Sequence, residues 1–174
     1  MTTPADDPTV GELSEGEILR RILSRLGRST AVVGPGDDAA VLRAPDGRYV
    51  VTTDMMIEGP DFRLAWSTPH DLGWKAAASN LSDIAAMGAI PSALVVAIAA
   101  PPATAIELLE GIADGLRDAC AALAPGCGVV GGDLSASDAL TLSITALGVV
   151  PSGRMVPRTG ARPFRTPRPR TRIR

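Results

Sequence analysis

The hydrophobic period of this chain switches repeatedly between helical and strand spacing, and the order of the switches restricts the fold more than any other feature. The first segment predicts a helix at 13–27, where Ile18, Ile22, Leu23 and Leu26 form one apolar stripe. Short apolar or alternating runs separated by GPGD and PDG then predict three strands, at residues 31–34, 38–44 and 48–54. The rest predicts a helix at 68–88, a strand at 92–100, a helix at 104–124 and strands at 128–133 and 139–150. This order predicts an α+β fold with a mixed or antiparallel sheet and helices packed on one face.

The expected helices carry recognisable start and stop signals. Ser14 followed three residues later by Glu17 forms a capping-box pattern. Thr68 before Pro69, and Gly88 as the stop, bound an alanine-rich helix that can pack very closely. We expect the second long helix to be capped by Thr104.

The composition indicates a protein with a sizeable core made of small side chains. The chain has 174 residues, of which 45% are hydrophobic and only 3% aromatic. The start of the chain is polar, and no apolar run is long enough to span a membrane, so we expect neither a membrane partner nor export. The two cysteines, Cys120 and Cys127, do not form a metal-ligand pattern and are expected to be reduced in a cytoplasmic protein.

The charge is distributed unevenly. Eight of the 17 basic residues lie between Arg154 and Arg174, where there is no acidic residue. Because the end of the chain is rich in arginine and proline and has no apolar periodicity, we expect 159–174 to be a disordered tail. The tail lacks interleaved aromatic residues and follows an acidic domain, so nucleic acid is not an expected partner. Residues 1–10 are expected to be a flexible N-terminus and residues 11–158 a single domain.

Several aspartates occupy positions that packing does not easily explain. Asp37 and Asp38 stand side by side in a glycine-proline turn, which by itself also fits an ordinary solvated turn. Asp54 and Asp133 follow apolar runs and are expected to end strands, and Asp83 is expected inside a helix. Two carboxylates about 4 Å apart repel by on the order of 4 kcal/mol near a protein surface, so converging acids favour a cation. Mg²⁺, held by a few carboxylates together with phosphate oxygens, is the natural candidate.

Other phosphate and catalytic motifs are absent from the sequence. There is no Walker-type G-x-x-x-x-G-K-[ST], and the only lysine, Lys75, falls inside an expected helix. His70 is the only histidine and is expected to be a surface residue. Gly131 and Gly132 would allow a backbone to approach a phosphate closely.

The motifs together resemble those of the thiamine-monophosphate kinase family. GPGDDAAVL, VVTTDMMIEG, KAAASNLSDIAAMGAIP, GVVGGDL and GRMVPRTGARP occur in the family's order, covering roughly residues 10–163. Single motifs also resemble the wider superfamily of ATP-using synthetases related to aminoimidazole ribonucleotide synthetase. The resemblance implies the N-terminal-domain fold of that superfamily and a homodimer paired through the sheet.

The resemblance also implies a reaction, in which the γ-phosphoryl group of ATP passes to thiamine monophosphate and gives thiamine diphosphate. The acceptor is itself an anionic phosphate with a second pKa of about 6, so the reaction needs charge cancellation by Mg²⁺ more than it needs a general base. ATP and thiamine monophosphate are thus the expected ligands, and no residue is assigned as catalytic.

Site residues are carried over by their motif positions. The implied metal ligands are Asp38, Thr52, Thr53, Asp54, Asp83 and Asp133. Nucleotide contacts are implied for Gly132, Asp133 and Arg158. The family reads EG-x-H-F where this chain reads EGPDF, so Asp61 stands at the position of a substrate-binding histidine.

The family continues after GARP with a second domain, whereas this sequence turns to FRTPRPRTRIR and stops. The expectation from the sequence is therefore a kinase domain with impaired activity. The alternative is a non-catalytic, dimerising module that still binds Mg²⁺ and nucleotide. Another synthetase of the same superfamily is a third reading.

Overall fold

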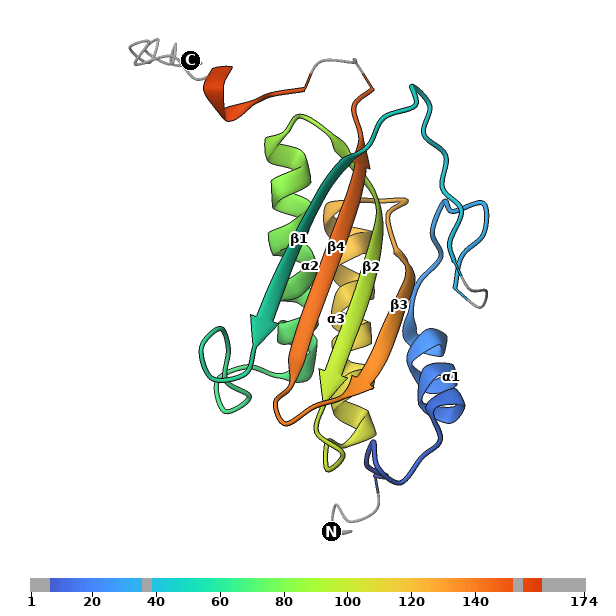
Figure 1. Ribbon diagram of the computed structural model, residues 1–174, viewed down its shortest axis with the longest axis vertical. Coiled ribbons are helices and arrows are strands. Elements are labelled where there is room, and N and C mark those ends of the chain that lie inside the picture. The colour runs from blue at the N-terminus through green and yellow to red at the C-terminus, as the bar shows by residue number, and fades with distance from the viewer. Residues whose placement is uncertain (1–6, 36–38, 152–154, 161–174) are drawn as a thin grey trace, which may run out of the picture.

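A computed structural model describes residues 7–35, 39–151 and 155–160 of the chain. Its centre is a four-stranded sheet (Figure 1). The strands are β1 (Val50–Ile57), β2 (Ile90–Ala100), β3 (Val129–Ala136) and β4 (Thr141–Val149), and they lie in the order β1-β4-β2-β3. β4 pairs antiparallel with β1 and β2, and β2 pairs parallel with β3. The predicted mixed sheet and α+β fold class are confirmed.

Two long helices cover one face of the sheet. α2 (Pro69–Ala86) and α3 (Ile106–Leu123) lie side by side behind the strands (Figure 1). α1 (Glu15–Arg25) lies beside β3 and contacts α3. A short 3₁₀ turn, η1 (Arg158–Gly160), ends the described part of the chain. In that part no helix is long and apolar enough to cross a membrane.

Glycines let α2 and α3 approach closely. A Cβ atom added to Gly73 of α2 would lie 2.0 Å from the carbonyl oxygen of Ile112. A Cβ atom added to Gly115 of α3 would lie 2.0 Å from the carbonyl oxygen of His70. The helix backbones are therefore nearly in contact, which is closer than alanine side chains alone would allow.

The core lies between this helix pair and the sheet. Along β4, residues Leu142, Ile144 and Ala146 are fully buried and alternate with partly exposed ones. This is the period-two pattern expected of a strand with one covered face. Asn80 of α2 is the most buried polar residue among those described, and its amide nitrogen donates to the Ala76 carbonyl.

Two of the three expected helix caps are confirmed. Ser14 with Glu17, and Thr68 with Asp71, form complete capping boxes. The third is wrong, because α3 begins at Ile106 after Ala105, and Thr104 makes no cap bond. The first amides of α3 instead donate to residues near the start of the chain. The Ile106 amide donates to the Pro8 carbonyl, and the Glu107 amide donates to Asp7 Oδ2 (2.6 Å).

The expectation of three strands before residue 55 is also wrong. Among the described residues only β1 joins the sheet, and the two preceding runs are linked by an isolated bridge between Val33 and Val41. Val32 and Val41 are 54% and 50% exposed, so these short apolar runs lack the covering layer that makes a strand stable. Asp54 and Asp133 are likewise not at strand ends, because each strand continues for three more residues.

The capping box of α2 predicts a pH dependence of stability. The pKa of Asp71 is lowered, first by the hydrogen bond from the Thr68 hydroxyl and then by the Thr68 amide. A lowered pKa contributes stability that is present above the unfolded-state value of about 3.9 and is lost as the pH falls through the folded-state value. We expect Asp71→Asn to destabilise the protein at pH 6 and to match the wild type at strongly acidic pH. Urea unfolding across this range measures the difference, and Glu107→Gln, on the first turn of α3, is the control.

Candidate nucleotide and metal site

Facing side chains of β1 and α2 bring together three of the residues that the sequence indicated, and we call this area the β1–α2 site. The Thr52 hydroxyl donates to Asp83 Oδ2 at 3.4 Å, which links the strand to the helix. Asp54 lies two residues after Thr52, so its side chain leaves β1 on the same face, toward α2. The β1–α2 site therefore combines two carboxylates and a hydroxyl, a set of oxygen donors that suits Mg²⁺ when phosphate oxygens complete the coordination.

Thr53 does not join this group through its side chain. It lies between Thr52 and Asp54, so its hydroxyl is on the opposite, open face of the sheet. There it donates to the Ile144 carbonyl at 3.1 Å and receives a hydrogen bond from the Thr145 hydroxyl at 3.1 Å.

Asp133 lies away from the β1–α2 site. It stands on β3, at the other edge of the sheet from β1, and three strand spacings separate these edges by about 14 Å. Its register partner is Ala97, and its Oδ2 accepts a hydrogen bond from the Ser135 hydroxyl at 2.9 Å. Among the residues described, no three acidic, histidine or cysteine side chains are grouped closely enough to hold a metal ion. One copy of the chain thus does not bring all the expected ligands together.

Asp133 and Gly132 instead border an apolar pocket of about 460 Å³. The pocket lies between α1, α3, β2 and β3, and α1 with its C-cap residue forms one wall with Leu19, Ile22, Leu23 and Leu26. The opposite side is formed by Val96, Ile98, Ala113, Leu116 and Val129, among others. An apolar pocket of this size with a few polar groups at its border is typical of a small-molecule site.

Sequence reasoning missed most of this pocket. The signal available in the sequence was the number of apolar residues in the first helix. The structure fully buries only Ile18 of them, which leaves the others free to line a pocket. Gly132 also has a structural reason that the sequence did not reveal. A Cβ atom there would lie 1.9 Å from the Val96 carbonyl oxygen, so the contact between β2 and β3 requires a glycine.

α1 is fixed over this pocket by ion pairs to α3. Glu110 of α3 is 7% exposed and pairs with both Arg21 and Arg25 of α1, the second at 2.8 Å. Arg25 also reaches Asp114 at 3.1 Å, and Arg21 reaches Asp7 at 3.2 Å. The pocket wall therefore depends on charged contacts along one side of α1.

The loop after β1 contains Asp61. Its Oδ2 accepts from the Ile57 amide at 2.8 Å, and its backbone carbonyl accepts from Lys75 Nζ at 2.9 Å. In this arrangement the Asp61 carboxylate stabilises the end of the strand, and the charge expected to meet an acceptor is already hydrogen-bonded to the backbone.

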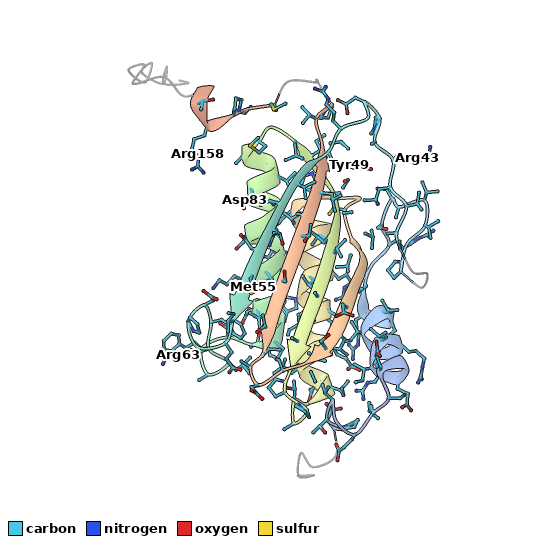
Figure 2. All side chains as sticks on the ribbon, viewed as in Figure 1. Arg43, Tyr49, Met55, Arg63, Asp83 and Arg158 are labelled. Atoms are coloured by element: carbon cyan, nitrogen blue, oxygen red, sulfur yellow. The ribbon has the colours of Figure 1, made fainter. Side chains whose placement is uncertain are left out.

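The remaining expected residues lie elsewhere. Arg158 is exposed in η1, beyond the end of α2, where the Val156 amide donates to the Met87 carbonyl (2.9 Å) (Figure 2). It is not among the residues that line the apolar pocket. Asp38 lies outside the described residues. His70 is half exposed, as expected, and its Nε2 is 2.9 Å from Asp118 Oδ2, a contact that lowers the pKa of Asp118 together with Arg117.

The fold defines a class of protein. The family described as AIR synthase related protein, N-terminal domain, matches residues 36–150, and the chain belongs to this family.

Among its members, the chain is similar to thiamine-monophosphate kinases. It is 45% identical over 145 residues to the one from Corynebacterium glutamicum, which covers 82% of this chain and 42% of the relative. It is 41% identical over 158 residues to the one from Mycobacterium tuberculosis strain H37Rv, covering 90% of this chain and 47% of the relative. The chain thus spans less than half the length of these relatives.

Solved structures of related kinases are similar to this chain as well. The thiamine-monophosphate kinase from Stenotrophomonas maltophilia K279a has a TM-score of 0.67 and 36% identity, over 83% of this chain and 45% of that one. A complex of AaThiL with AMPPCP and TMP has a TM-score of 0.56 and 28% identity, over 76% of this chain and 40% of that one. The hydrogenase maturation protein HypE, at 22% identity and a TM-score of 0.59, shares the fold.

Proposed function

We propose that this chain is the ATP- and Mg²⁺-binding part of a thiamine-phosphate kinase, which transfers the γ-phosphoryl group of ATP to thiamine monophosphate. The observation that carries the proposal is the position of Gly132 and Asp133 at the border of the 460 Å³ pocket. These are the residues for which the family resemblance implies nucleotide contacts. The complex of a related protein with AMPPCP and TMP supports the same pair of ligands.

In this proposal the apolar side chains of α1 and α3 bind the base and exclude water from it. Asp54, Asp83 and the Thr52 hydroxyl would hold Mg²⁺, which when bound neutralises the phosphate charges. The acceptor phosphate is already an anion, so this site needs no side chain that removes a proton. Its task is positioning and charge cancellation, which accounts for a site rich in aspartate and without histidine.

A homodimer would explain why Asp54 and Asp133 lie on opposite edges of the sheet. A second copy whose β1 edge lies near the β3 edge of the first would bring the two carboxylates close together. The uncovered face of the sheet supports such pairing, because Val51 and Met55 are 58% and 59% exposed on it. Each complete site would then contain residues of both copies.

A complementation experiment tests this arrangement. We expect Asp54→Asn and Asp133→Asn each to weaken binding of Mg²⁺-ATP by about tenfold or more, since each removes a ligand of the metal. A re-equilibrated equal mixture of the two variants should regain about a quarter of the wild-type sites, because half of the dimers are mixed and each has one intact site. Titration calorimetry counts the sites, and sedimentation measures the dimer.

Asp138→Asn is the control, because this exposed aspartate lies in the turn between β3 and β4, away from the β1–α2 site. Without metal, Asp54→Asn should be slightly more stable than the wild type, because the proposed arrangement places its charge near that of Asp83. Unchanged ATP binding in both variants would overturn the metal assignment, and absence of recovery in the mixture would overturn the shared site. Product formation from ATP, Mg²⁺ and thiamine monophosphate separates a kinase from a module that only binds nucleotide.

A further inference from the structure

The loop 58–67, which joins β1 to α2, is held in place by several independent contacts. Phe62 is buried, at 7% exposure, and pairs with Glu58 through an isolated bridge. Asp61 accepts a hydrogen bond from the Ile57 amide, and the only lysine of the chain, Lys75, donates to the Asp61 carbonyl. These contacts fix the backbone of a surface loop that could otherwise be mobile.

This ordered loop presents an exposed tryptophan. Trp66 is 75% exposed, although the whole chain has only five residues of Phe, Trp and Tyr. The Arg63 guanidinium lies over its ring, 4.7 Å from the centroid, which is a cation–π contact. Arg63 restrains the orientation of the indole and covers one of its faces, so the other face remains available for a second planar group.

A small pocket of about 170 Å³ lies beside Trp66. Phe62 and Leu72 give it an apolar floor, and Lys75 supplies a polar group at its border. This pocket is much smaller than the one of about 460 Å³ beside Asp133. Its size suits a single ring, whereas a whole nucleoside would need the larger pocket.

The small pocket and the carboxylates of the β1–α2 site lie at different positions along α2. Lys75 precedes Asp83 by eight residues of α2, a rise of about 12 Å along the helix. Figure 2 shows Arg63 at one end of this side of the molecule and Asp83 toward the other. A phosphate joined through a two-carbon arm to two linked heteroaromatic rings spans a comparable distance.

Resting on the proposed function, we propose that Trp66 is a specificity residue that stacks on the heteroaromatic end of the acceptor. The acceptor phosphate would lie near Asp54 and Asp83, and its terminal ring would enter the pocket between Trp66 and Leu72. Lys75 and Asp61 are positioning residues, because they hold the loop that carries the indole.

The test uses thiamine monophosphate as the probe and Trp66 as the reporter. In a Trp74→Phe background Trp66 is the only tryptophan, and its fluorescence should change when thiamine monophosphate and Mg²⁺ are added. Trp66→Ala should weaken binding of thiamine monophosphate by about tenfold, in line with the effect of removing one stacked aromatic ring. Trp66→Phe should recover most of it. Ribose 5-phosphate, which has a phosphate and no aromatic ring, should bind the wild type and Trp66→Ala equally.

Leu123→Ala, at an exposed apolar residue at the end of α3, is the matched control and should bind thiamine monophosphate as the wild type does. Equal affinity of Trp66→Ala and wild type, or no binding by the wild type, would overturn the inference. Mg²⁺-ATP binding is measured in the same samples and should be unchanged by Trp66→Ala. If the wild type does not bind Mg²⁺-ATP but Trp66 fluorescence still responds to thiamine monophosphate, the result would count against the kinase proposal and support the stacking site.

Discussion

Replacing Gly115 by alanine is expected to destabilise the protein by about 3 kcal/mol or more, which is at the upper end for overpacking. The new Cβ atom would lie 2.0 Å from the His70 carbonyl oxygen and 2.8 Å from the Trp74 amide nitrogen. Both neighbours are backbone atoms of α2, so no side chain can rotate away and the helices must separate. A domain of this size is stable by only about 5–15 kcal/mol, so the loss is a large fraction of the total. Urea unfolding followed by far-UV circular dichroism measures it.

Gly16→Ala provides the matched control. Gly16 is also helical, but a Cβ atom there would meet nothing within 4 Å. Because alanine has the higher helix propensity, Gly16→Ala should be neutral or stabilising by up to about 1 kcal/mol. Equal stability of Gly115→Ala and Gly16→Ala would show that α2 and α3 are not in backbone contact.

The helices were largely predictable from the sequence because their signals are local. The capping boxes at Ser14 and Thr68, and the stop at Gly88, depend only on residues within one turn of the helix end. The contact through Gly73 and Gly115 was not predictable, since it depends on which helix packs against which. The α3 cap failed for a similar reason, because its partners, Pro8 and Asp7, are about 100 residues away in the chain.

The site was predictable in its residue types and only partly in its geometry. Chain order indicated Asp54, Asp83 and Asp133, but the sheet order β1-β4-β2-β3 places the first and the last on opposite edges. That strand order is set by pairing between strands that are distant in the chain, and the hydrophobic periodicity of the sequence does not reveal which strands pair. The apolar pocket beside Asp133 was missed because its walls come from four separate elements, each of which looked like ordinary core.

Replacing Glu110 by alanine tests the attachment of α1, which forms one wall of that pocket. Glu110 is nearly buried and accepts from two arginines, so hydrogen bonds to a charged group are lost at a desolvated position. We expect a destabilisation of about 2 kcal/mol, below the value for a fully buried pair because the Arg21 and Arg25 side chains are 32% and 44% exposed.

The same change should loosen the pocket wall before it unfolds the domain. With Glu110 gone, Arg21 and Arg25 keep only their weaker contacts to Asp7 and Asp114, so hydrogen exchange should increase in α1 and not in α2. Arg25→Ala combined with Glu110→Ala should cost less than the sum of the two single changes, by about 1 kcal/mol, since the pair is shared. Arg20→Ala, on the exposed side of α1, should change neither exchange nor stability by a comparable amount. Uniformly faster exchange in all three helices would show that Glu110 supports the whole domain and not α1 in particular.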